Sequence, residues 1–306
     1  MTQPQLICSH LTKRFGDTIV VNDLSFELQA GECLGVIGPN GAGKTTTFRM
    51  CLGLSTADSG NISVFGMPMP QETLAIKARL GVVSQFDTLD PDFTCSENLM
   101  VYGRYFGMDR ADIDARIEPL LEFAALSHKA NAKPGELSGG MKRRMLVAQA
   151  LVHKPPVIVL DEPTAGVDVE LRQTLWQFIA KLNKLGHTVL LTTHYLEEAE
   201  ALCQRIAMLK NGKVVALDRT DELLKAASSN VLRFKLDAAL PPALAAKARV
   251  TGRIVQLPAH DALEIERHLA ALREAGLNAE DVEIRKADLE DVFLDVMHAN
   301  TVQETV

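Results

Sequence analysis

The residues best suited to chemistry lie in a glycine-rich loop near the N-terminus. Residues 38 to 45 read GPNGAGKT and fit the pattern G-x-x-x-x-G-K-[ST] at each fixed position. Glycines allow backbone N–H groups to approach the anionic oxygens of a triphosphate, and Lys44 adds a positive charge. The Thr45 hydroxyl suits a magnesium ion between the β- and γ-phosphates. The predicted nucleotide-binding residues are Gly38, Pro39, Asn40, Gly41, Ala42, Gly43, Lys44, Thr45 and Thr46.

The segments on either side of this loop have the pattern that phosphate binding requires. Residues 33 to 37 (CLGVI) suit a buried strand, and residues 46 to 54 place Phe48, Cys51 and Leu52 on one side of a helix. A helix that begins at the loop also directs its N-terminal dipole at an anion. The alternative is a glycine-rich turn that only connects a strand to a helix.

Two carboxylates follow a second apolar run. Residues 157 to 160 (VIVL) indicate a buried strand of a parallel sheet, and Asp161 and Glu162 follow at its C-terminal end, where open α/β sheets bind ligands. Asp161 suits the coordination shell of Mg²⁺. Glu162 suits a general base that polarises the attacking water. With the glycine-rich loop, these residues predict Mg²⁺-dependent hydrolysis of a nucleoside triphosphate.

Polar residues at three further places complete the candidate site. Gln85 ends the short apolar strand that begins at residue 80, and His194 ends another that begins at residue 187. Ser138, Gly139 and Gly140 precede a helical run and offer both an N-cap and bare N–H groups for a phosphate. Taken singly, the serine is as well explained by a simple helix cap and the histidine by a structural role.

The sequence leaves open whether one aromatic residue, Phe15, is exposed or buried. Alternating patterns over residues 6 to 15 and 19 to 28, separated by Gly16 and Asp17, predict a small antiparallel sheet at the start of the chain. Phe15 ends the first of these strands, where its ring could stack on an adenine or pack in the core.

Composition excludes several classes of protein. A net charge of −7 and a pI near 5.7 argue against a nucleic-acid-binding surface, and the basic run 142 to 144 is more readily solvated or paired. Five scattered cysteines indicate reduced thiols rather than a metal site. There is no signal-peptide pattern and no apolar stretch near the ~20 residues that span a bilayer, so we expect any membrane role to depend on a partner.

The order of the predicted elements gives an α/β fold. We expect a mostly parallel core sheet, the N-terminal antiparallel subdomain, and an inserted helical subdomain at about 88–150. The boundary is predicted within residues 224 to 229, giving a nucleotide-binding domain at 1–225 and a small α+β domain at 226–306. In the latter, strands are expected over 231–236, 249–257 and 282–286, with helices over 262–275 and around Leu289 to Val296.

These motifs, in this order, resemble an ABC transporter ATP-binding cassette over about residues 5 to 222. Residues 38 to 45 resemble its Walker A motif, 137 to 140 (LSGG) its signature, 157 to 162 Walker B, and 165 to 168 the D-loop, which adds Asp168 to the predicted nucleotide-binding residues. Gln85, His194 and Phe15 match the Q-loop glutamine, the switch histidine and the adenine-stacking aromatic. The signature departs from LSGGQ at Met141, as in ABC-2 type exporters of the nodulation-factor and daunorubicin-resistance groups.

The resemblance implies ATP and Mg²⁺ as cofactors, with Gln85 joining Thr45 and Asp161 around the metal. It also implies a homodimer in which Ser138 and Gly140 of one cassette close over the γ-phosphate held by Lys44 of the other. It further implies a separate integral-membrane permease, no nucleic acid, and a peripheral position on the cytoplasmic face of the cell membrane. The substrate expected from this group is amphipathic, such as a lipo-oligosaccharide, a drug or a polysaccharide.

An aromatic-rich stretch after Gln85 is a candidate contact for the permease. Its members are Phe86, Leu89, Phe93, Tyr102, Tyr105 and Phe106. Aromatic side chains are favoured as interface anchors, although each could instead pack the core of the helical subdomain. Two other functions remain open, a soluble ABC ATPase without a transport role and an importer ATPase.

Overall fold

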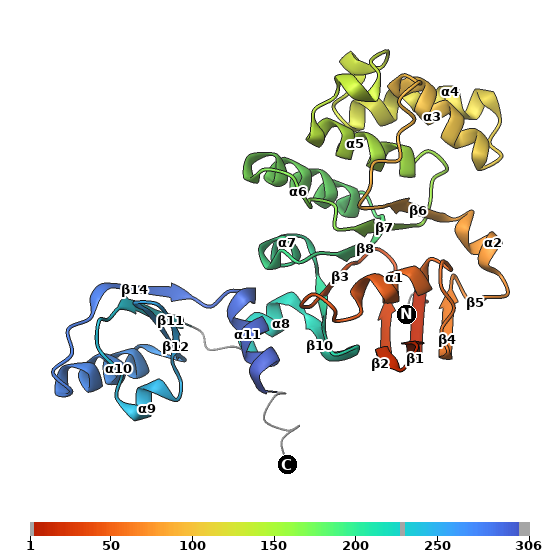
Figure 1. Cartoon of the computed structure of the whole chain (residues 1–306). Helices are drawn as coiled ribbons and strands as arrows, with labels where there is room; N and C mark the ends of the chain where they lie inside the picture. The colour runs from red at the N-terminus through yellow and green to blue at the C-terminus, as the bar shows by residue number, and fades with distance from the viewer. Residues whose placement is uncertain (1–2, 227–229, 300–306) are drawn as a thin grey trace. The chain divides into compact units, whose positions relative to one another are not determined.

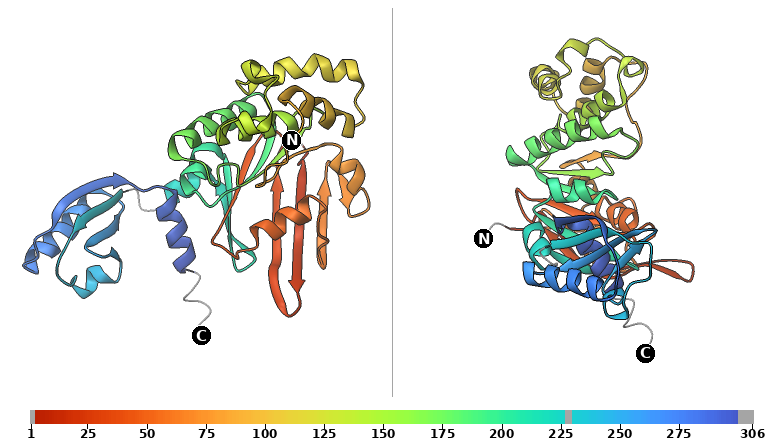
Figure 2. Two further views of the ribbon diagram at one scale, coloured as in Figure 1. Left: turned by 45° about the horizontal axis from the view of Figure 1, so that its top comes forward. Right: turned by 90° about the vertical axis from the view of Figure 1, so that its left-hand side faces the viewer.

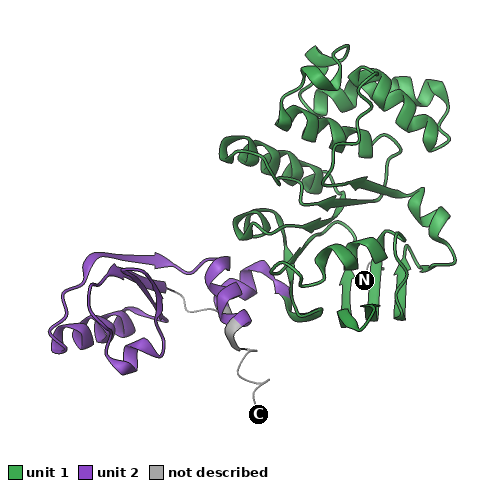
Figure 3. Cartoon of the chain, in the orientation of Figure 1, with its two compact units in different colours: residues 1–217 green, residues 218–306 purple. Residues whose placement is uncertain are grey.

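The computed structural model describes residues 3–226 and 230–299 of the 306-residue chain. It divides into two compact units, residues 1–217 and residues 218–306 (Figure 3). The predicted boundary between residues 225 and 226 lies further along the chain, near the end of helix α8 (Thr220–Ala226), and residues 227–229 of the expected boundary segment lie outside the described residues.

A six-stranded sheet forms the centre of the first unit, in the order β10-β9-β3-β8-β7-β6 (Figure 1). Its strands are β3 (Cys33–Ile37), β6 (Leu80–Val83), β7 (Val157–Asp161), β8 (Thr188–Thr192), β9 (Arg205–Lys210) and β10 (Lys213–Arg219). The neighbours from β9 to β6 pair in parallel, as predicted from apolar runs that are buried on both faces. Because β3, β7 and β8 are parallel, the residues that follow them lie at the same edge of the sheet.

A four-stranded antiparallel sheet packs against the same core. Its order is β2-β1-β4-β5, with β1 (Leu6–Phe15), β2 (Thr18–Leu28), β4 (Ser59–Val64) and β5 (Met67–Met69). Helix α1 (Lys44–Cys51) buries Phe48 and Met50 in one cluster with Leu24 of this sheet and with Val36 and Leu190 of the parallel sheet. The phosphate-loop helix is therefore anchored in the core that the two sheets share.

Three helices form the inserted subdomain beyond β6 and β7 (Figures 1 and 2). They are α3 (Cys95–Tyr105), α4 (Arg110–Phe123) and α5 (Gly139–Ala150). A capping box starts α3, in which the Glu97 amide donates to Thr94 Oγ1 and the Thr94 amide donates to the Glu97 carboxylate. The other elements of the unit are α2 (Thr73–Lys77), α6 (Val169–Lys184), α7 (Leu196–Leu202), and the short 3₁₀ turns η1 (Ser127–Lys129) and η2 (Pro134–Glu136).

The second unit has a β-α-β-β-α-β arrangement. Its sheet has the order β12-β13-β11-β14 with antiparallel neighbours, which is the split βαβ topology. The elements are β11 (Asn230–Lys235), α9 (Pro242–Ala245), β12 (Arg249–Thr251), β13 (Ile254–Ala259), α10 (Ala262–Glu274), β14 (Glu280–Lys286) and α11 (Leu289–Ala299). The predicted single strand over residues 249 to 257 is wrong. Gly252, with φ +60°, turns the chain so that Thr251 pairs with Ile254 in a hairpin.

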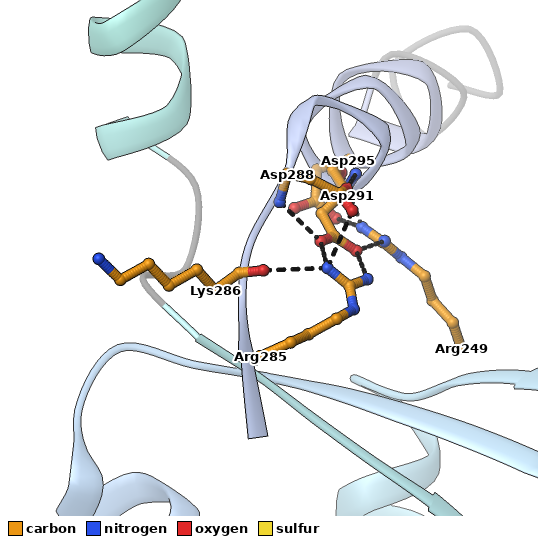
Figure 4. A network of polar contacts seen from close by, with 6 residues as sticks. All are labelled: Arg249, Arg285, Lys286, Asp288, Asp291 and Asp295. Atoms are coloured by element: carbon orange, nitrogen blue, oxygen red, sulfur yellow. Dashed lines mark hydrogen bonds and ion pairs between the residues drawn. The ribbon is translucent and has the colours of Figure 1, made fainter. Parts of the chain in front are cut away.

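A buried carboxylate attaches α11 to the sheet of the second unit (Figure 4). Asp291 accepts two hydrogen bonds from the Arg285 guanidinium, at 2.7 and 3.0 Å, and one from Arg249 at 2.9 Å. Burial alone would raise the pKa of Asp291, but the bonds from Arg285 and the Asp288 amide, together with both guanidinium charges, hold it below the ordinary value. Asp291 therefore remains ionised and clamps α11 to β12 and β14.

Candidate functional site

The glycine-rich loop connects β3 to α1, and its backbone requires glycine at two positions. Gly43 is the N-cap of α1 with φ +97°, and a Cβ there would lie 2.7 Å from the carbonyl oxygen of Val20. A Cβ on Gly38 would lie 2.4 Å from the carbonyl oxygen of Leu209. Packing thus presses both ends of the loop against neighbouring backbone, which fixes its shape. Pro39, Asn40 and Gly41 are exposed at the tip of the loop, whereas Ala42 is buried.

The Lys44 ammonium group is directed into its own loop. Its Nζ donates to the carbonyl oxygens of Gly38 at 2.7 Å and Pro39 at 3.1 Å, and the residue is only 7% exposed. Burial lowers the pKa of Lys44, while the nearby charges of Glu162 and Asp161 act in the opposite direction. The cation and the two carboxylates that the sequence singled out therefore lie within electrostatic reach of one another.

Asp161 ends β7 beside the last residue of β8. The Thr192 hydroxyl donates to Asp161 Oδ1 at 2.5 Å, so this oxygen is oriented while the carboxylate remains half-buried. Thr45 is exposed at the start of α1 and Thr46 is half-buried. These are hard oxygen donors, the type that Mg²⁺ takes from proteins.

Two of the predicted catalytic side chains lie close to a carboxylate oxygen of the third. Glu162 Oε2 lies 3.4 Å from Gln85 Nε2, after β6, and 3.5 Å from His194 Nδ1, after β8. The three residues follow three different strands, so the parallel sheet is what brings them together. The Glu162 amide also donates to the carbonyl and to the hydroxyl oxygen of Thr192, each at 3.1 Å.

The backbone of Glu162 has a conformation that is uncommon for a residue with a side chain. Its φ is +46°, in the left-handed region, which the surrounding structure must impose. Such outliers gather at functional sites, and here the outlier is the residue on which Gln85 and His194 converge.

The signature residues lie at the start of α5. Ser138 caps this helix by accepting the Met141 amide at 3.4 Å, as its simple structural role would require. A Cβ on Gly140 would lie 1.9 Å from Leu171 of α6, a helix that Asp168 caps by accepting the Leu171 amide at 2.9 Å. Among the described residues, no hydrogen bond or ion pair joins Ser138, Gly139 or Gly140 to the glycine-rich loop. Within one chain, these residues therefore lie at the start of α5 and make no such contact with the loop.

Phe15 is on the surface. It ends β1 with 57% of its area exposed, and the Lys13 ammonium lies 5.5 Å from the centre of its ring. A packed core position for Phe15 is therefore excluded.

Arg143 is a functional residue that was expected to be solvated or simply paired. It is 7% exposed, and its guanidinium donates to five carbonyl oxygens of two separate segments. The acceptors are Ser84, Gln85, Asp161, Glu162 and Pro163, at 2.6 to 3.3 Å. Helical periodicity offered a signal, since Arg143 precedes the buried residues Leu146 and Val147 by three and four positions. It holds the backbones that carry Gln85 and Glu162 to the helix that begins at the signature.

We expect Arg143→Lys to destabilise the first unit. Lysine keeps the charge, but its single ammonium cannot reach the carbonyl oxygens that the planar guanidinium bridges. The free energy of unfolding should fall by about 2 to 3 kcal/mol, as for loss of buried hydrogen bonds from a charged donor. Urea denaturation measures this, with Arg144→Lys as the control, because Arg144 makes no hydrogen bond within the described ranges. Equal midpoints for the two variants would contradict the role given to Arg143.

Comparison with known proteins agrees with this geometry. Residues 21–165 match the ABC transporter family. The chain is 56% identical over 207 residues to the Nod factor export ATP-binding protein I of Burkholderia lata, covering 68% of each chain. It is 48% identical over 216 residues to the protein of the same name from Rhizobium etli, covering 71% of this chain and 68% of the relative.

Solved structures give the same assignment for the first unit. An ATP-binding subunit of an ABC transporter aligns with a TM-score of 0.65 and 28% identity, over 72% of this chain and 92% of that one. A dimeric cassette in a post-hydrolysis state, bound to ADP and Pi, aligns with a TM-score of 0.62 and 28% identity, over 70% and 98%. The chain belongs to the ABC transporter family, as an ATP-binding subunit that hydrolyses ATP. The predicted resemblance and fold class are confirmed.

No helix in the described part of the chain is both long enough and apolar enough to cross a lipid bilayer.

Proposed function

We propose that this chain powers an ABC-2 type exporter by hydrolysing ATP on the cytoplasmic face of the cell membrane. The observation that carries the mechanism is the convergence of Gln85 and His194 on Glu162 Oε2, beside the phosphate loop. The names of relatives at 48 to 56% identity support export, and favour a lipo-oligosaccharide over other amphipathic substrates.

In this proposal Glu162 is the general base for the attacking water. A carboxylate at this position accepts a proton, and His194, 3.5 Å away after the neighbouring strand β8, contacts the γ-phosphate or the water. Gln85 orients the same carboxylate through its amide. Lys44 and the backbone N–H groups of residues 40 to 46 hold the phosphates, and Phe15 stacks on the adenine.

We propose Mg²⁺ as the metal, held by Thr45, Asp161 and Gln85. No group of three or more His, Cys, Asp or Glu side chains suited to a metal ion occurs within the described ranges. This fits Mg²⁺, which is usually bound by one or two carboxylates together with the phosphates of its nucleotide. When bound, the ion neutralises charge on the phosphate oxygens. The orientation of Asp161 by Thr192 prepares one of its ligands.

A second copy of the chain completes each site. Ser138, Gly139 and Gly140 are presented at the N-terminus of α5, whose dipole and free N–H groups favour an anion. A head-to-tail pair of cassettes would bring these groups, and Asp168, to the phosphates held by Lys44 of the other copy. In this arrangement residues 1–225 act as the cassette and residues 226–306 as an accessory domain.

We also propose that the membrane partner is a separate permease, which contacts the exposed aromatic residues after β6. Phe86 is 77% exposed and Tyr105 is 81% exposed. Other members of the stretch pack inside the subdomain instead: Leu89 is buried, and Phe106 stacks on His153 with ring centres 3.6 Å apart. Burial raises the pKa of Tyr102, whose ring lies 5.1 Å from Phe106. Phe93 is half-buried, so the exposed aromatic residues of the stretch are Phe86 and Tyr105.

Co-expression with a candidate permease, such as an integral-membrane protein encoded by a neighbouring gene, tests the proposal. We expect the permease to bring the chain to the membrane fraction, and Phe86→Asp or Tyr105→Asp to release it, because a charge at an apolar anchor must be desolvated. ATP binding should be unchanged in both variants. Leu185→Asp is the control, since Leu185 is 64% exposed at the end of α6 and not in this stretch. Recovery of the wild-type chain only in the soluble fraction would favour an ABC ATPase without a transport role.

A further inference from the structure

A buried carboxyl group behind the site has no role in the mechanism described above. Glu198, in the first turn of α7, is fully buried with 0% of its area exposed. Its Oε1 accepts hydrogen bonds from the Thr164 hydroxyl at 2.9 Å and from the Trp176 indole N–H at 3.1 Å. Its Oε2 is buried too and has no hydrogen-bond partner among the described residues. Burying a glutamate side chain costs free energy, so its burial at this position requires a physical reason.

Glu198 joins three elements, two of which follow directly after Glu162 and His194. Thr164 is itself fully buried and lies two residues after Glu162, in the turn where the Ala165 amide donates to the Glu162 carbonyl oxygen at 3.1 Å. Helix α7, which holds Glu198, begins directly after the loop that contains His194. Trp176 belongs to α6, whose N-cap is Asp168.

The left-handed backbone of Glu162 depends on this support. Residues in that region persist only where the surroundings over-determine them. Arg143 donates to the carbonyl oxygens of Glu162 and Pro163, at 2.8 and 2.6 Å. The hydrogen bond between Thr164 and Glu198 holds the next residue of the turn.

We propose that Glu198 is a positioning residue for ATP hydrolysis. Its hydrogen bond with Thr164 connects the turn after Glu162 to the helix that begins after His194, and so keeps the side chains of Glu162 and His194 correctly placed relative to each other. The proposal rests on the roles given above to Glu162 and His194. A displacement of about 1 Å at such a site costs on the order of 10²-fold in rate, whereas nucleotide binding should be little affected because neither Glu198 nor Thr164 belongs to the phosphate loop.

The charge state of Glu198 provides an independent signature. Burial raises the pKa of its carboxyl group from 4.5, although interactions with Thr193, Thr164 and Trp176 and the charge of Arg172 act against this. The other ionisable groups that interact with it are Arg143 and the Cys203 thiol. Because the pKa is raised in the folded state, the stabilisation from this group is complete below pH 4.5 and is lost as the pH rises through the folded-state pKa.

Steady-state kinetics and nucleotide binding test the positioning role. Glu198→Ala should lower kcat by about 10- to 100-fold while the Kd for ATP changes less than about threefold. Thr164→Val removes the same hydrogen bond by deleting its donor, so it should give a similar loss of kcat. The double variant should be no slower than Glu198→Ala alone. Glu198→Gln keeps an acceptor of the same shape and should restore most of the rate at neutral pH. Glu197→Gln, an exposed neighbour on α7, is the control.

Fluorescence tests the charge state of Glu198 separately from its effect on the rate. Trp176 is the chain's one tryptophan, and its N–H is bonded to Glu198. Its emission should titrate with pH in the wild type and in Glu197→Gln, above the range of an ordinary carboxyl group, and should not titrate in Glu198→Gln. Titration that persists in Glu198→Gln would overturn the charge assignment.

The outcomes separate this inference from the proposed function. If Glu162→Gln abolishes turnover while folded Glu198→Ala and Thr164→Val hydrolyse ATP at the wild-type rate, Glu198 is not a positioning residue and the catalytic assignment stands. If Glu162→Gln turns over normally, the catalytic assignment fails first. If Glu198→Ala does not fold, Thr164→Val and Glu198→Gln still decide the matter through kcat and the fluorescence titration.

Discussion

Glu162→Gln is expected to lower kcat by a factor on the order of 10² to 10⁴ while leaving ATP binding intact. The amide keeps the shape of the side chain and can still bond to Gln85, but it cannot accept a proton from water. In the presence of ATP and Mg²⁺ the variant should accumulate as a dimer, because the closed pair of cassettes forms but does not hydrolyse its ATP and separate.

Single-turnover kinetics and light scattering measure the two effects. Glu122→Gln is a matched control, since Glu122 is exposed on α4 and lies in none of the predicted motifs. A folded Glu162→Gln variant that binds ATP and yet stays monomeric would remove the head-to-tail arrangement. Unchanged kcat would remove Glu162 as the base.

Lys44→Ala is expected to weaken ATP binding by about 10- to 100-fold, because a charged donor to the phosphates is lost. The same change removes the two bonds by which Lys44 holds its own loop at Gly38 and Pro39. Part of the loss should therefore come from a less ordered loop as well as from the missing charge.

Calorimetry with ATP and with ADP separates these contributions. Loss of loop order should weaken both nucleotides alike, whereas loss of a contact to the terminal phosphates should weaken ATP more. Lys154→Ala, an exposed lysine after α5, controls for the change in net charge. ATP binding of wild-type strength in Lys44→Ala would contradict the assignment of the loop.

The parts of the site that are local in sequence could be predicted from it. An apolar run followed by polar residues identifies a strand and the end at which it carries ligands, as for Asp161 and Glu162, whereas the functional roles of Gln85 and His194 were implied by the family resemblance. Their convergence required only that the strands be parallel. The N-cap role of Ser138 was also readable, because it depends on the next three residues alone.

The parts of the site that depend on segments distant in the sequence could not be predicted from it. The acceptors of Arg143 come from residues 84 to 85 and 161 to 163, and nothing in the basic run around it identifies them. Glu198 was overlooked for the same reason, since its partners lie on α6 and after β7. The hairpin at Gly252 was missed because one glycine between two strand-forming runs gives a weaker turn signal than Asn211-Gly212.

The anchoring of α1 has a consequence for cooperativity. Phe48 and Met50 are buried in the cluster that joins the antiparallel and parallel sheets, so α1 cannot open by itself without disrupting both. Its amide protons should therefore exchange with solvent only when the unit as a whole unfolds, unlike helices that open locally. Nucleotide bound at the start of α1 then stabilises every element of that core through mass action. Ligand affinity and global stability are thus linked through a single helix.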